Sequence, residues 1–519
     1  MGRPAHLERF WDRVVRRAHG ERFIVTEIHL TAAWVTAQMA GAIAVGDQMR
    51  EFGDVSIDSR TLKSGDLFIA IRGDRFDGVA FADAAIDAGA AGVVVPRGWS
   101  ASRRAAGRDA PGRAKASAER PVVIEVDDTT AALQALARGI RRESGTKVVA
   151  ITGSAGKTTT KEVTSEFLER RYRVVRNRGN FNNHIGLPLS LIELRQRPEI
   201  AVVELGMNHP GEISTLVRVA EPEVRVWTNV GEAHLGFFAS LDAIADAKAE
   251  IFEGADASTL LVANADEERI AARLRSFRGR VVTFGIDRDA DVRATHVVDG
   301  GIEGTSARVT TPRGSVDVTT PLIGRVNLAN ILAATTVALE FDVPLSDVAE
   351  MAARLQPASH RGEVVRLASG ITVVDDSYNA NPTATKRALE VLRSANATRR
   401  IAVIGEMLEL GDASTALHES VGRAAAQAGV DVLLAVGGSP AIALADAAVA
   451  AGMPAANVRY FATSDQAADA AVALAAAGDV VLVKGSRGVK TDRVVERLQA
   501  ERGCCCTTSS TRSTRRCPC

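Results

Sequence analysis

Short apolar runs that end in polar or glycine residues alternate along most of the chain with longer segments of helical periodicity. Residues 147–151 read KVVAI and predict a buried strand. The segment TKEVTSEFLERRY, at residues 160–172, places apolar Val163 and Phe167 four positions apart, which predicts a helix. Between strand and helix lies the glycine-containing stretch TGSAGKTT. A strand, a turn and a helix in this order predict an α/β fold.

The same pattern divides the chain into three α/β regions with an extension at each end. Residues 1–26 and the cysteine-rich residues 503–519 are expected to be disordered, and the ordered fold is expected to begin near IHLTAAWVTAQM. We place an N-terminal domain at residues 27–127, a central domain at 128–355 and a C-terminal domain at 356–502. Residues 97–121 have the composition of a mobile basic loop.

Strands are expected at several apolar runs of the second and third regions. In the central region, where strands and helices are expected to alternate, IAVVELGMN and VRVWTNVGEAH read as strands with polar residues at their carboxyl ends. Ligands bind at those ends in open α/β sheets. The third region contributes the predicted strands ITVVDD, RRIAVIG, VDVLLAVGG and DVVLVKG.

Composition narrows the class of protein. Lys plus Arg and Asp plus Glu both count 63 in 519 residues, so no basic excess indicates a nucleic-acid partner. No apolar run approaches the roughly 20 residues that a bilayer requires, so membrane insertion is not expected. All five cysteines lie in the C-terminal extension, and the cysteine-free body is compatible with a reducing cytosol. We therefore expect a cytoplasmic protein.

The stretch between the first strand and helix of the central region has the chemistry of a phosphate-binding loop. Backbone N–H groups and a helix N-terminus attract anions, Lys157 can reach the β- and γ-phosphates, and the Thr158 hydroxyl suits Mg²⁺. The strict G-x-x-x-x-G-K-[ST] pattern fails, because Ile151 holds the first glycine position. Such a loop can serve a motor, a switch, a kinase or a ligase.

Three polar residues lie at strand ends or on a nearby helix: Glu204, His234 and Lys248. Each has an ordinary interpretation when considered alone. Glu204 could be a helix N-cap or a solvated strand end, and a lone histidine is more often a satisfied core residue than a ligand. Lys248, within IADAKAEI, has the appearance of a surface lysine on a helix.

A series of longer motifs resembles the Mur ligase family. In chain order they are TGSAGKTTTKE, NRGNFNNHIGLPLSL, ELGMNHPGEI, TNVGEAHLGFFASLDAIADAKAEIF, GRVNLANILAA, DDSYNANP, GEMLELG and VLVKGSRG. The resemblance covers residues 28–498. NFNNHIGLP, ELGMNHPGEI and DDSYNANP resemble the branch that joins D-alanyl-D-alanine to UDP-N-acetylmuramoyl-tripeptide. The resemblance implies a small UDP-substrate-binding α/β domain, a central P-loop ATPase-like parallel sheet and a Rossmann-like C-terminal domain.

The resemblance also implies roles for individual residues. ATP phosphates would be held by Gly153, Ser154, Ala155, Gly156, Lys157, Thr158 and Thr159, adenine by Asn327 and Asn330, and ribose by Asp376. Two Mg²⁺ ions would be bound by Thr158, Glu204, His234 and a carbamylated Lys248. The substrates would be bound by Asp58, Ser59, Arg60, Asn182, Asn183, Asn379 and Asn381.

Two positions depart from the family pattern. Arg361 resembles the arginine that touches the γ-phosphate, although it lies in SHRGEV where this ligase type usually has Gly-Arg. Val326, in GRVNLAN, stands where the family commonly has histidine. Lys157, Glu204, His234, Lys248 and Arg361 form the expected catalytic set.

The implied reaction activates a carboxylate with ATP. Transfer of the γ-phosphoryl group gives an acyl phosphate, and the amine of D-alanyl-D-alanine then displaces phosphate. Both steps concentrate negative charge, which Mg²⁺, Lys157 and helix N-termini stabilise. We expect a monomer whose partners are UDP-N-acetylmuramoyl-tripeptide and D-alanyl-D-alanine.

Three alternatives stay open. A sibling ligase would add the third residue, lysine or diaminopimelate, and would differ in NFNNHIGLP and DDSYNANP. A P-loop switch protein would need a guanine-reading N-K-x-D-type loop, which is not evident after the phosphate loop. An inactive binding protein on the same scaffold would not need Lys157, Glu204, His234 and Lys248 together.

Overall fold

The structure is a computed structural model that describes residues 26–73, 76–105, 120–232 and 235–503. These residues form two compact units. The first unit comprises the described residues up to Thr146 together with Leu191–Pro198, and the second comprises Lys147–Ser190 and the described residues from Glu199 onward. The cysteine-rich segment from residue 504, the first 25 residues and His234 lie outside the described residues.

A five-stranded sheet forms the first unit, as an α/β fold requires. Its strands in spatial order are β2 (Ala42–Val45), β7 (Val122–Val126), β6 (Gly92–Pro96), β5 (Leu67–Ile69) and β4 (Val55–Ser56). All neighbours are parallel except β2, which runs antiparallel to β7. A separate antiparallel pair joins β1 (Leu30–Thr31) to β3 (Glu51–Phe52). The helices are α2 (Ala32–Gln38), α3 (Ala82–Asp87), α4 (Trp99–Ala105) and α5 (Thr129–Ser144).

Helix α5 belongs to the first unit, whereas the sequence-based boundary placed it after residue 127 with the central domain. The Asp128 carboxylate caps its N-terminus by accepting hydrogen bonds from the N–H groups of Thr130 (2.7 Å) and Ala131 (3.0 Å). Gly145, in the left-handed conformation with φ +69°, ends it. Its buried side chains include Leu133, Leu136 and Ile140.

Part of the predicted basic loop at residues 97–121 is helical. Helix α4 occupies Trp99–Ala105, and residues 106–119 lie outside the described part. The Glu125 carboxylate, on β7, accepts hydrogen bonds from the N–H groups of Gly98 (3.1 Å) and Ser100 (2.8 Å) at the start of this helix. Arg103 adds an ion pair with Asp83. Composition gave no sign of these contacts, because the two carboxylates lie outside the loop.

The second unit contains a nine-stranded central sheet. Its strands in spatial order are β16 (Gly314–Thr320), β15 (Thr305–Thr311), β14 (Val292–Asp299), β13 (Arg280–Gly285), β12 (Leu260–Asn264), β11 (Val224–Trp227), β8 (Lys147–Thr152), β10 (Ile200–Glu204) and β9 (Val174–Arg176). The strands from β9 to β14 are parallel, so the carboxyl ends of β8, β10 and β11 lie at one edge. The strands predicted at IAVVELGMN and VRVWTNVGEAH are confirmed as β10 and β11.

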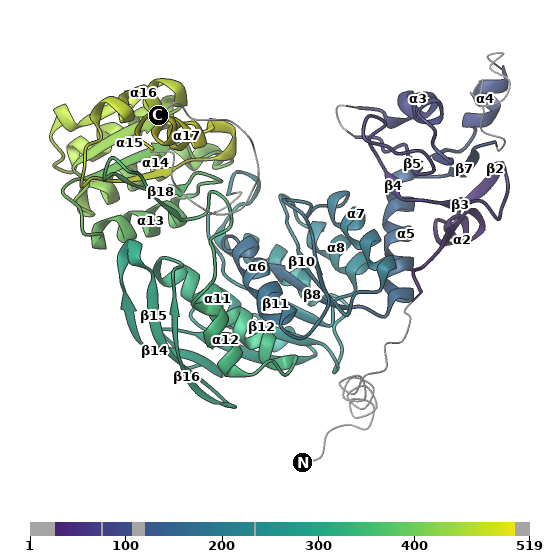
Figure 1. Cartoon of the computed structure of the whole chain (residues 1–519), viewed down its shortest axis with the longest axis horizontal. Helices are drawn as coiled ribbons and strands as arrows, with labels where there is room; N and C mark the ends of the chain where they lie inside the picture. The colour runs from purple at the N-terminus through teal and green to yellow at the C-terminus, as the bar shows by residue number, and fades with distance from the viewer. Residues whose placement is uncertain (1–25, 74–75, 106–119, 233–234, 504–519) are drawn as a thin grey trace. The chain divides into compact units, whose positions relative to one another are not determined.

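The outer edge of this sheet departs from the predicted alternation of strands and helices. Strands β14, β15 and β16 follow one another as an antiparallel meander (Figure 1). Along β15 nearly every second residue is buried, as expected when one face of a strand packs on a core and the other meets solvent.

Helices α6 (Lys157–Glu169) and α11 (Gly324–Glu340) pack against each other beside the central strands. Phe167 on α6 and Ile331 on α11 lie in one buried cluster with Val149 and Ile151 of β8. This packing fixes both helix starts relative to the carboxyl end of β8. The other helices of this part are α7 (Gly186–Ile192), α8 (Glu212–Ala220), α9 (Leu241–Ala249), α10 (Glu268–Ala271) and α12 (Leu345–Ala352).

A six-stranded sheet forms the C-terminal part of the second unit. Its strands in spatial order are β17 (Glu363–Arg366), β18 (Thr372–Asp376), β22 (Val480–Lys484), β19 (Arg400–Gly405), β20 (Val432–Val436) and β21 (Val458–Phe461). Only β17 is antiparallel to its neighbour among these described strands. The four predicted strands are confirmed as β18, β19, β20 and β22. The helices are α13 (Pro382–Ser394), α14 (Ser414–Gln427), α15 (Ser439–Ala450), α16 (Ser464–Leu474) and α17 (Asp492–Arg502).

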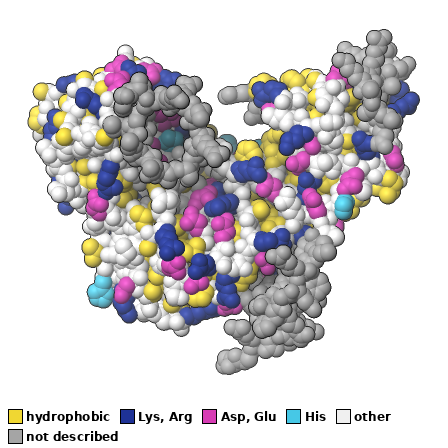
Figure 2. Space-filling model, viewed as in Figure 1, with side chains coloured by type: hydrophobic (Ala, Val, Ile, Leu, Met, Phe, Trp, Pro, Cys, Tyr) yellow, Lys and Arg dark blue, Asp and Glu magenta, His cyan; other side chains and the backbone are white. Residues whose placement is uncertain are grey.

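The surface agrees with the balanced composition. On the face drawn in Figure 2, Lys and Arg side chains are interspersed with Asp and Glu side chains. Within the described ranges, no helix combines the length and apolar character needed to cross a membrane.

Candidate active site

The phosphate-binding loop is held in shape by two neighbours. Gly153 and Gly156 both have positive φ, and a Cβ atom at these positions would lie 1.9 Å from Thr228 Oγ1 and 2.4 Å from Asn330 Oδ1. Only glycine therefore fits at either position. Helix α6 starts directly after Gly156, so its first N–H groups face the carboxyl end of β8. This is the arrangement that binds phosphate groups.

Residues that follow β11 tie the loop to the sheet. The Asn229 side chain accepts a hydrogen bond from Ala155 N–H (2.8 Å) and donates one to Ala155 C=O (2.9 Å). Ser154 Oγ donates to Gly231 C=O (3.1 Å) and accepts from Gly231 N–H (2.9 Å). Sequence reasoning missed Asn229, although it lies inside the TNVGEAH motif. Its role depends on the pairing of β11 with β8, which no local pattern encodes.

Lys157 connects the loop with charges from two other segments. Its Nζ donates a hydrogen bond to Gly153 C=O at 2.7 Å. Burial lowers the pKa of Lys157 below its ordinary value; the Glu204 carboxylate opposes this shift and the Arg361 guanidinium adds to it. Glu204 and Arg361 thus both affect the pKa of Lys157, and all three residues belong to the predicted catalytic set.

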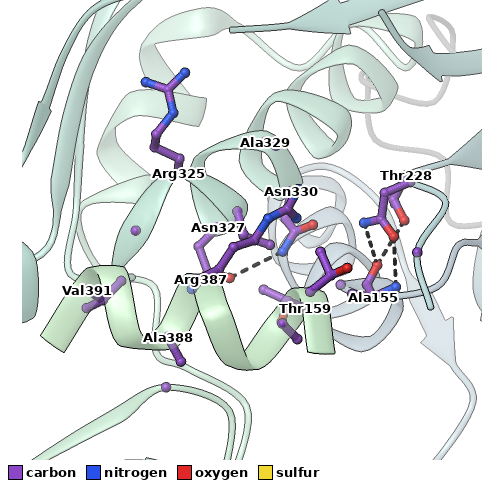
Figure 3. Close-up of a pocket in the computed structure, with 18 of the residues that line it drawn as sticks. Ala155, Thr159, Thr228, Arg325, Asn327, Ala329, Asn330, Arg387, Ala388 and Val391 are labelled. Atoms are coloured by element: carbon purple, nitrogen blue, oxygen red, sulfur yellow. Dashed lines mark hydrogen bonds between the residues drawn. The ribbon is translucent and has the colours of Figure 1, made fainter. Parts of the chain in front are cut away.

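A cavity of about 610 Å³ opens next to the loop and is lined by both parts of the second unit. Asn327 and Asn330 of α11 lie in it, and Asn330 Nδ2 donates to Asn327 Oδ1 at 3.2 Å. Figure 3 shows Asn330 beside Thr159, with Arg387, Ala388 and Val391 contributed by α13. The lining includes Ser154, Ala155, Gly156, Thr159, Asn327, Asn330, Arg361, Asp376, Asn379 and Asn381 from the predicted site.

The C-terminal side of the cavity is built around Asp376 at the end of β18. Lys484, buried at the end of β22, donates to Asp376 Oδ2 (2.6 Å) and to Asn379 C=O (3.0 Å). The Arg361 guanidinium stacks on the Tyr378 ring, 4.1 Å from its centroid. Asn381 caps α13 by accepting a hydrogen bond from Ala384 N–H at 2.8 Å. Lys484 and Tyr378 were not predicted, though both lie in quoted motifs.

Glu204, at the end of β10, is buried and shares its carboxylate with two partners. Its Oε1 lies 3.3 Å from Lys161 Nζ, and its Oε2 accepts a hydrogen bond from Asn182 Nδ2 at 3.4 Å. Lys161 also approaches Glu162 (3.0 Å) and donates to Asn177 C=O (2.8 Å). Sequence reasoning missed Lys161, which looks like any lysine in the first turns of a helix.

The Asn183 side chain forms hydrogen bonds within its own segment. Its Oδ1 accepts hydrogen bonds from the N–H groups of Ile185 (3.2 Å) and of Gly186 (2.8 Å), the first residue of α7. Asn182 is thus the member of the predicted pair whose side chain contacts Glu204.

Lys248, on α9, is 2% exposed, so its interpretation as a surface lysine is wrong. Burial lowers the pKa of Lys248 well below its ordinary value, and the positive charge of Lys157 adds to the shift. Among the described residues predicted to bind the phosphates and Mg²⁺, those that do not line the cavity beside the loop are Gly153, Lys157, Thr158, Glu204 and Lys248.

A metal centre is not assembled among the described side chains. Within these ranges, no three His, Cys, Asp or Glu side chains gather as a metal-binding group. His234, one of the predicted Mg²⁺ ligands, lies outside the described residues. Glu204 Oε1 is buried, accepts no hydrogen bond and lies 3.3 Å from Lys161 Nζ, so a cationic side chain faces the carboxylate oxygen at this strand end.

The predicted uridine-binding segment lies in the first unit. Asp58 Oδ1 accepts hydrogen bonds from the N–H (3.0 Å) and Nε (2.9 Å) of Arg60, and Asp58 Oδ2 accepts from Nη2 at 2.7 Å. The hydrogen bonds from the Arg60 side chain and backbone lower the pKa of Asp58 to about 2. Ser59 lies between them in the same turn. The aspartate therefore orients the arginine, which is exposed.

Comparison with known proteins assigns the family. Family models for the Mur ligase family catalytic domain, the Mur ligase middle domain and the Mur ligase glutamate ligase domain match residues 51–141, 151–338 and 360–487. A UDP-N-acetylmuramoyl-tripeptide–D-alanyl-D-alanine ligase of Bacillus subtilis is 34% identical over 445 residues, which are 86% of this chain and 92% of that protein. The chain belongs to the Mur ligase family.

Solved structures of Mur ligases agree with this assignment. A MurF structure from Acinetobacter baumannii has a TM-score of 0.80 at 31% identity and covers 92% of this chain and 100% of that one. A MurF ligase from Thermotoga maritima in complex with ADP has a TM-score of 0.73 at 28% identity, with 86% and 97% covered. The predicted three-domain Mur ligase architecture is thereby confirmed; its residue boundaries stay predictions.

Proposed function

We propose that this chain is an ATP-dependent ligase that joins D-alanyl-D-alanine to UDP-N-acetylmuramoyl-tripeptide, a cytoplasmic step of peptidoglycan precursor synthesis. One observation carries the proposal. The phosphate loop opens onto a cavity that also receives Arg361 and Asp376 from the C-terminal part. The loop residues that are proposed to bind the ATP phosphates therefore share one cavity with Arg361 and Asp376.

ATP is the nucleotide that this cavity suits. Gly153 and Gly156 allow the loop to pack closely against Thr228 and Asn330, and the start of α6 supplies N–H donors for phosphate groups. In the proposal the amides of Asn327 and Asn330 bind adenine, and Asp376 binds the ribose. Lys157 exchanges its hydrogen bond with Gly153 C=O for contacts to the phosphates, as the P-loop lysine does elsewhere. The bound ADP of the Thermotoga maritima protein supports this assignment.

The reaction proceeds in two steps whose atoms balance. An oxygen of the tripeptide carboxylate attacks the γ-phosphorus of ATP, the bond to the β-phosphate oxygen breaks, and ADP leaves. The amine of D-alanyl-D-alanine attacks the resulting acyl phosphate, loses a proton and displaces phosphate, which keeps the carboxylate oxygen. Lys157 and Arg361 stabilise the charge on the transferred group.

Mg²⁺ is part of the proposal, and the residues fit it in kind. Hard cations prefer oxygen ligands, and Glu204 supplies a buried carboxylate that attracts a cation, as its 3.3 Å ion pair with Lys161 shows. The Thr158 hydroxyl, at the first turn of α6, and His234 complete the proposed ligand set. Two ions so held would neutralise the negative charge between the phosphates and the carboxylate.

Carbamylation of Lys248 extends this ligand set. Carbon dioxide adds only to the unprotonated amine, and burial together with the Lys157 charge favours that form of Lys248. The carbamate replaces a cation by an anion with two oxygen atoms of the kind that Mg²⁺ prefers.

The remaining predicted residues are assigned to the two substrates. Arg60, which is exposed and oriented by Asp58, is proposed to hold the uridine diphosphate end together with Ser59. Asn182 and Asn183 of NFNNHIGLP and Asn379 and Asn381 of DDSYNANP are proposed to bind the peptide ends. Residues 27–127, 128–355 and 356–502 are the proposed domains.

The experiment that tests this function measures phosphate release in four mixtures. Each contains the full chain, ATP and Mg²⁺, with UDP-N-acetylmuramoyl-tripeptide, D-alanyl-D-alanine, both, or UDP-N-acetylmuramoyl-dipeptide with lysine or diaminopimelate. Sustained release only when tripeptide and D-alanyl-D-alanine are both present supports the proposal. Release with the dipeptide mixture instead would assign the chain to the sibling ligase, and release independent of all acceptors would contradict ligase activity.

A further inference from the structure

The turn that carries Arg361 contains a histidine in a conformation that favours glycine. His360 has φ +61°, and Gly362, two residues on, has φ +76°. An L-residue with a Cβ is strained in this left-handed region, and a strained residue persists only when its surroundings hold it there. The turn is therefore fixed by contacts outside its own backbone.

The main contact is a hydrogen bond to a buried carboxylate. His360 Nδ1 donates to Asp375 Oδ2 at 2.7 Å, and Asp375 is 2% exposed. The other oxygen of Asp375 accepts hydrogen bonds from the N–H (3.1 Å) and the hydroxyl (2.5 Å) of Ser377. One carboxylate at the end of β18 thus holds the Arg361 turn and the beginning of the segment after β18.

Two backbone hydrogen bonds also join the Arg361 turn to the end of β18 and to the segment that follows it. Gly362 N–H donates to Asp375 C=O at 2.8 Å, and Tyr378 N–H donates to His360 C=O at 3.1 Å. Arg361 lies between these bonds and stacks on the Tyr378 ring. The position of its guanidinium at the cavity therefore depends on the turn on one side and the ring on the other.

We propose that His360 is a positioning residue whose bond to Asp375 holds the left-handed turn that directs the Arg361 guanidinium into the nucleotide cavity. The inference rests on the proposed function, in which Arg361 contacts the γ-phosphate. Glycine at this position would adopt the turn without strain but would supply no anchor. Histidine is strained in this conformation, but its side chain anchors the turn to the buried Asp375 carboxylate on β18.

A double-mutant cycle with Arg361 tests this role. His360→Ala keeps the strain and removes the anchor, His360→Gly removes both, and His360→Asn tolerates the left-handed conformation and retains a donor for Asp375. His360→Ala should lower kcat roughly tenfold with a smaller change in KM for ATP, and His360→Asn should recover most of that loss. In an Arg361→Ala background, His360→Ala should change kcat less than twofold.

A matched control is available in the central sheet. His296 also has positive φ (+50°) but lies in an exposed part of β14, so His296→Gly reports relaxation of a strained backbone away from the cavity. Its kcat should equal that of the unaltered chain. Melting temperatures of all variants show which are folded, and His360→Asn keeps the test decisive if His360→Ala does not fold.

The outcomes separate the inference from the proposed function. An unaltered chain without ligase turnover would contradict the function. Ligase turnover with equal losses from His360→Ala in both backgrounds, or with no loss in either, would overturn the positioning role. If Arg361→Ala turns over too slowly to measure, the same cycle is run on the Kd of a non-hydrolysable ATP analogue, with the same criterion.

Discussion

Two lysines of the central region, Lys161 and Lys248, are buried to a similar degree but differ in what surrounds them. Lys161, on α6, lies within 3.3 Å of two carboxylates and donates to Asn177 C=O. Lys248, on α9, has its pKa lowered well below the ordinary value by burial and by the Lys157 charge. Burying an ammonium group is unfavourable unless it is paired.

The difference is what the proposal requires of a structural cation, Lys161, and of an amine that reacts with carbon dioxide, Lys248. Lys161 neutralises the Glu204 carboxylate through the ion pair of its Nζ with Glu204 Oε1. Burial and the Lys157 charge lower the pKa of Lys248, and the proposed carbamylation requires its neutral amine. A sequence pattern cannot make this distinction, because both residues are lysines on amphipathic helices near the phosphate loop.

Replacement of Lys248 should have the largest effect. Lys248→Ala removes the proposed carbamate ligand, so turnover should fall by roughly 10²–10³-fold, as for loss of one group that stabilises transition-state charge. Short carboxylic acids such as formate or acetate should restore part of the rate by supplying the missing oxygen ligand. The rate is measured as phosphate release over a range of Mg²⁺ concentrations.

Lys386→Ala, on α13, is a suitable control, since the added acids should leave its rate unchanged. A Lys248→Ala chain with a near-normal rate at low Mg²⁺ would remove Lys248 from the metal site. An equal response of both variants to the acids would show that the acids act elsewhere.

Replacement of Lys161 should act mainly on stability. Lys161→Met leaves the buried Glu204 carboxylate without its cation, and loss of one member of a buried pair destabilises a protein by about 3 kcal/mol. Urea unfolding measures this change. The double variant Lys161→Met/Glu204→Gln should regain much of the stability, because no uncompensated charge remains, but should stay inactive.

If Lys161→Met is as stable as the unaltered chain, the ion pair is not the reason for the burial of Lys161. If the double variant turns over normally, Glu204 is not a metal ligand. The first result would contradict the structural role of Lys161, and the second would contradict the proposed metal site beside it.

His418 is another buried titratable side chain, and we expect it to have a smaller, pH-dependent effect on stability. It is fully buried in α14, where Nδ1 donates to Ser414 C=O (2.7 Å) and Nε2 accepts from Met407 N–H (2.9 Å). Burial lowers the pKa of His418 below its ordinary value of 6.5, with the Ser414 bond opposing the shift. At a pH between the folded-state pKa and 6.5, His418 therefore binds a proton in the unfolded chain but not in the folded chain.

Its contribution to stability is fully present above pH 6.5 and is lost as the pH falls from there toward the folded-state pKa. The slope approaches about 1.4 kcal/mol per pH unit. Urea unfolding between pH 7.5 and 5.5 should show this slope in the unaltered chain and a shallower one in His418→Gln. Identical slopes would assign the pH dependence to other groups.

The sequence predicted the elements whose periodicity or motif is local. The phosphate loop, the strands β8, β10, β11, β18, β19, β20 and β22, and the polar strand ends belong to this group. The α4 helix and the β14–β16 meander were not predicted, because Glu125 and the edge of the central sheet determine them from outside their own sequence.

In the site, the side chains that hold the predicted residues were missed. Lys161, Asn229, Lys484 and the His360–Asp375 bond each act across a strand pairing or a helix contact. A sequence motif can indicate a residue that is proposed to contact substrate. The partners that orient it depend on register and topology, which emerge only in the folded chain.

The central claim is that ATP activates a carboxylate, and transfer of an oxygen atom tests it most directly. UDP-N-acetylmuramoyl-tripeptide labelled with ¹⁸O in the terminal carboxylate of the third residue is incubated with the chain, ATP, Mg²⁺ and D-alanyl-D-alanine. The account predicts one ¹⁸O atom in each released phosphate, because the acyl phosphate retains the carboxylate oxygen when the amine attacks. Unlabelled phosphate released alongside the ligated product would contradict the acyl-phosphate route.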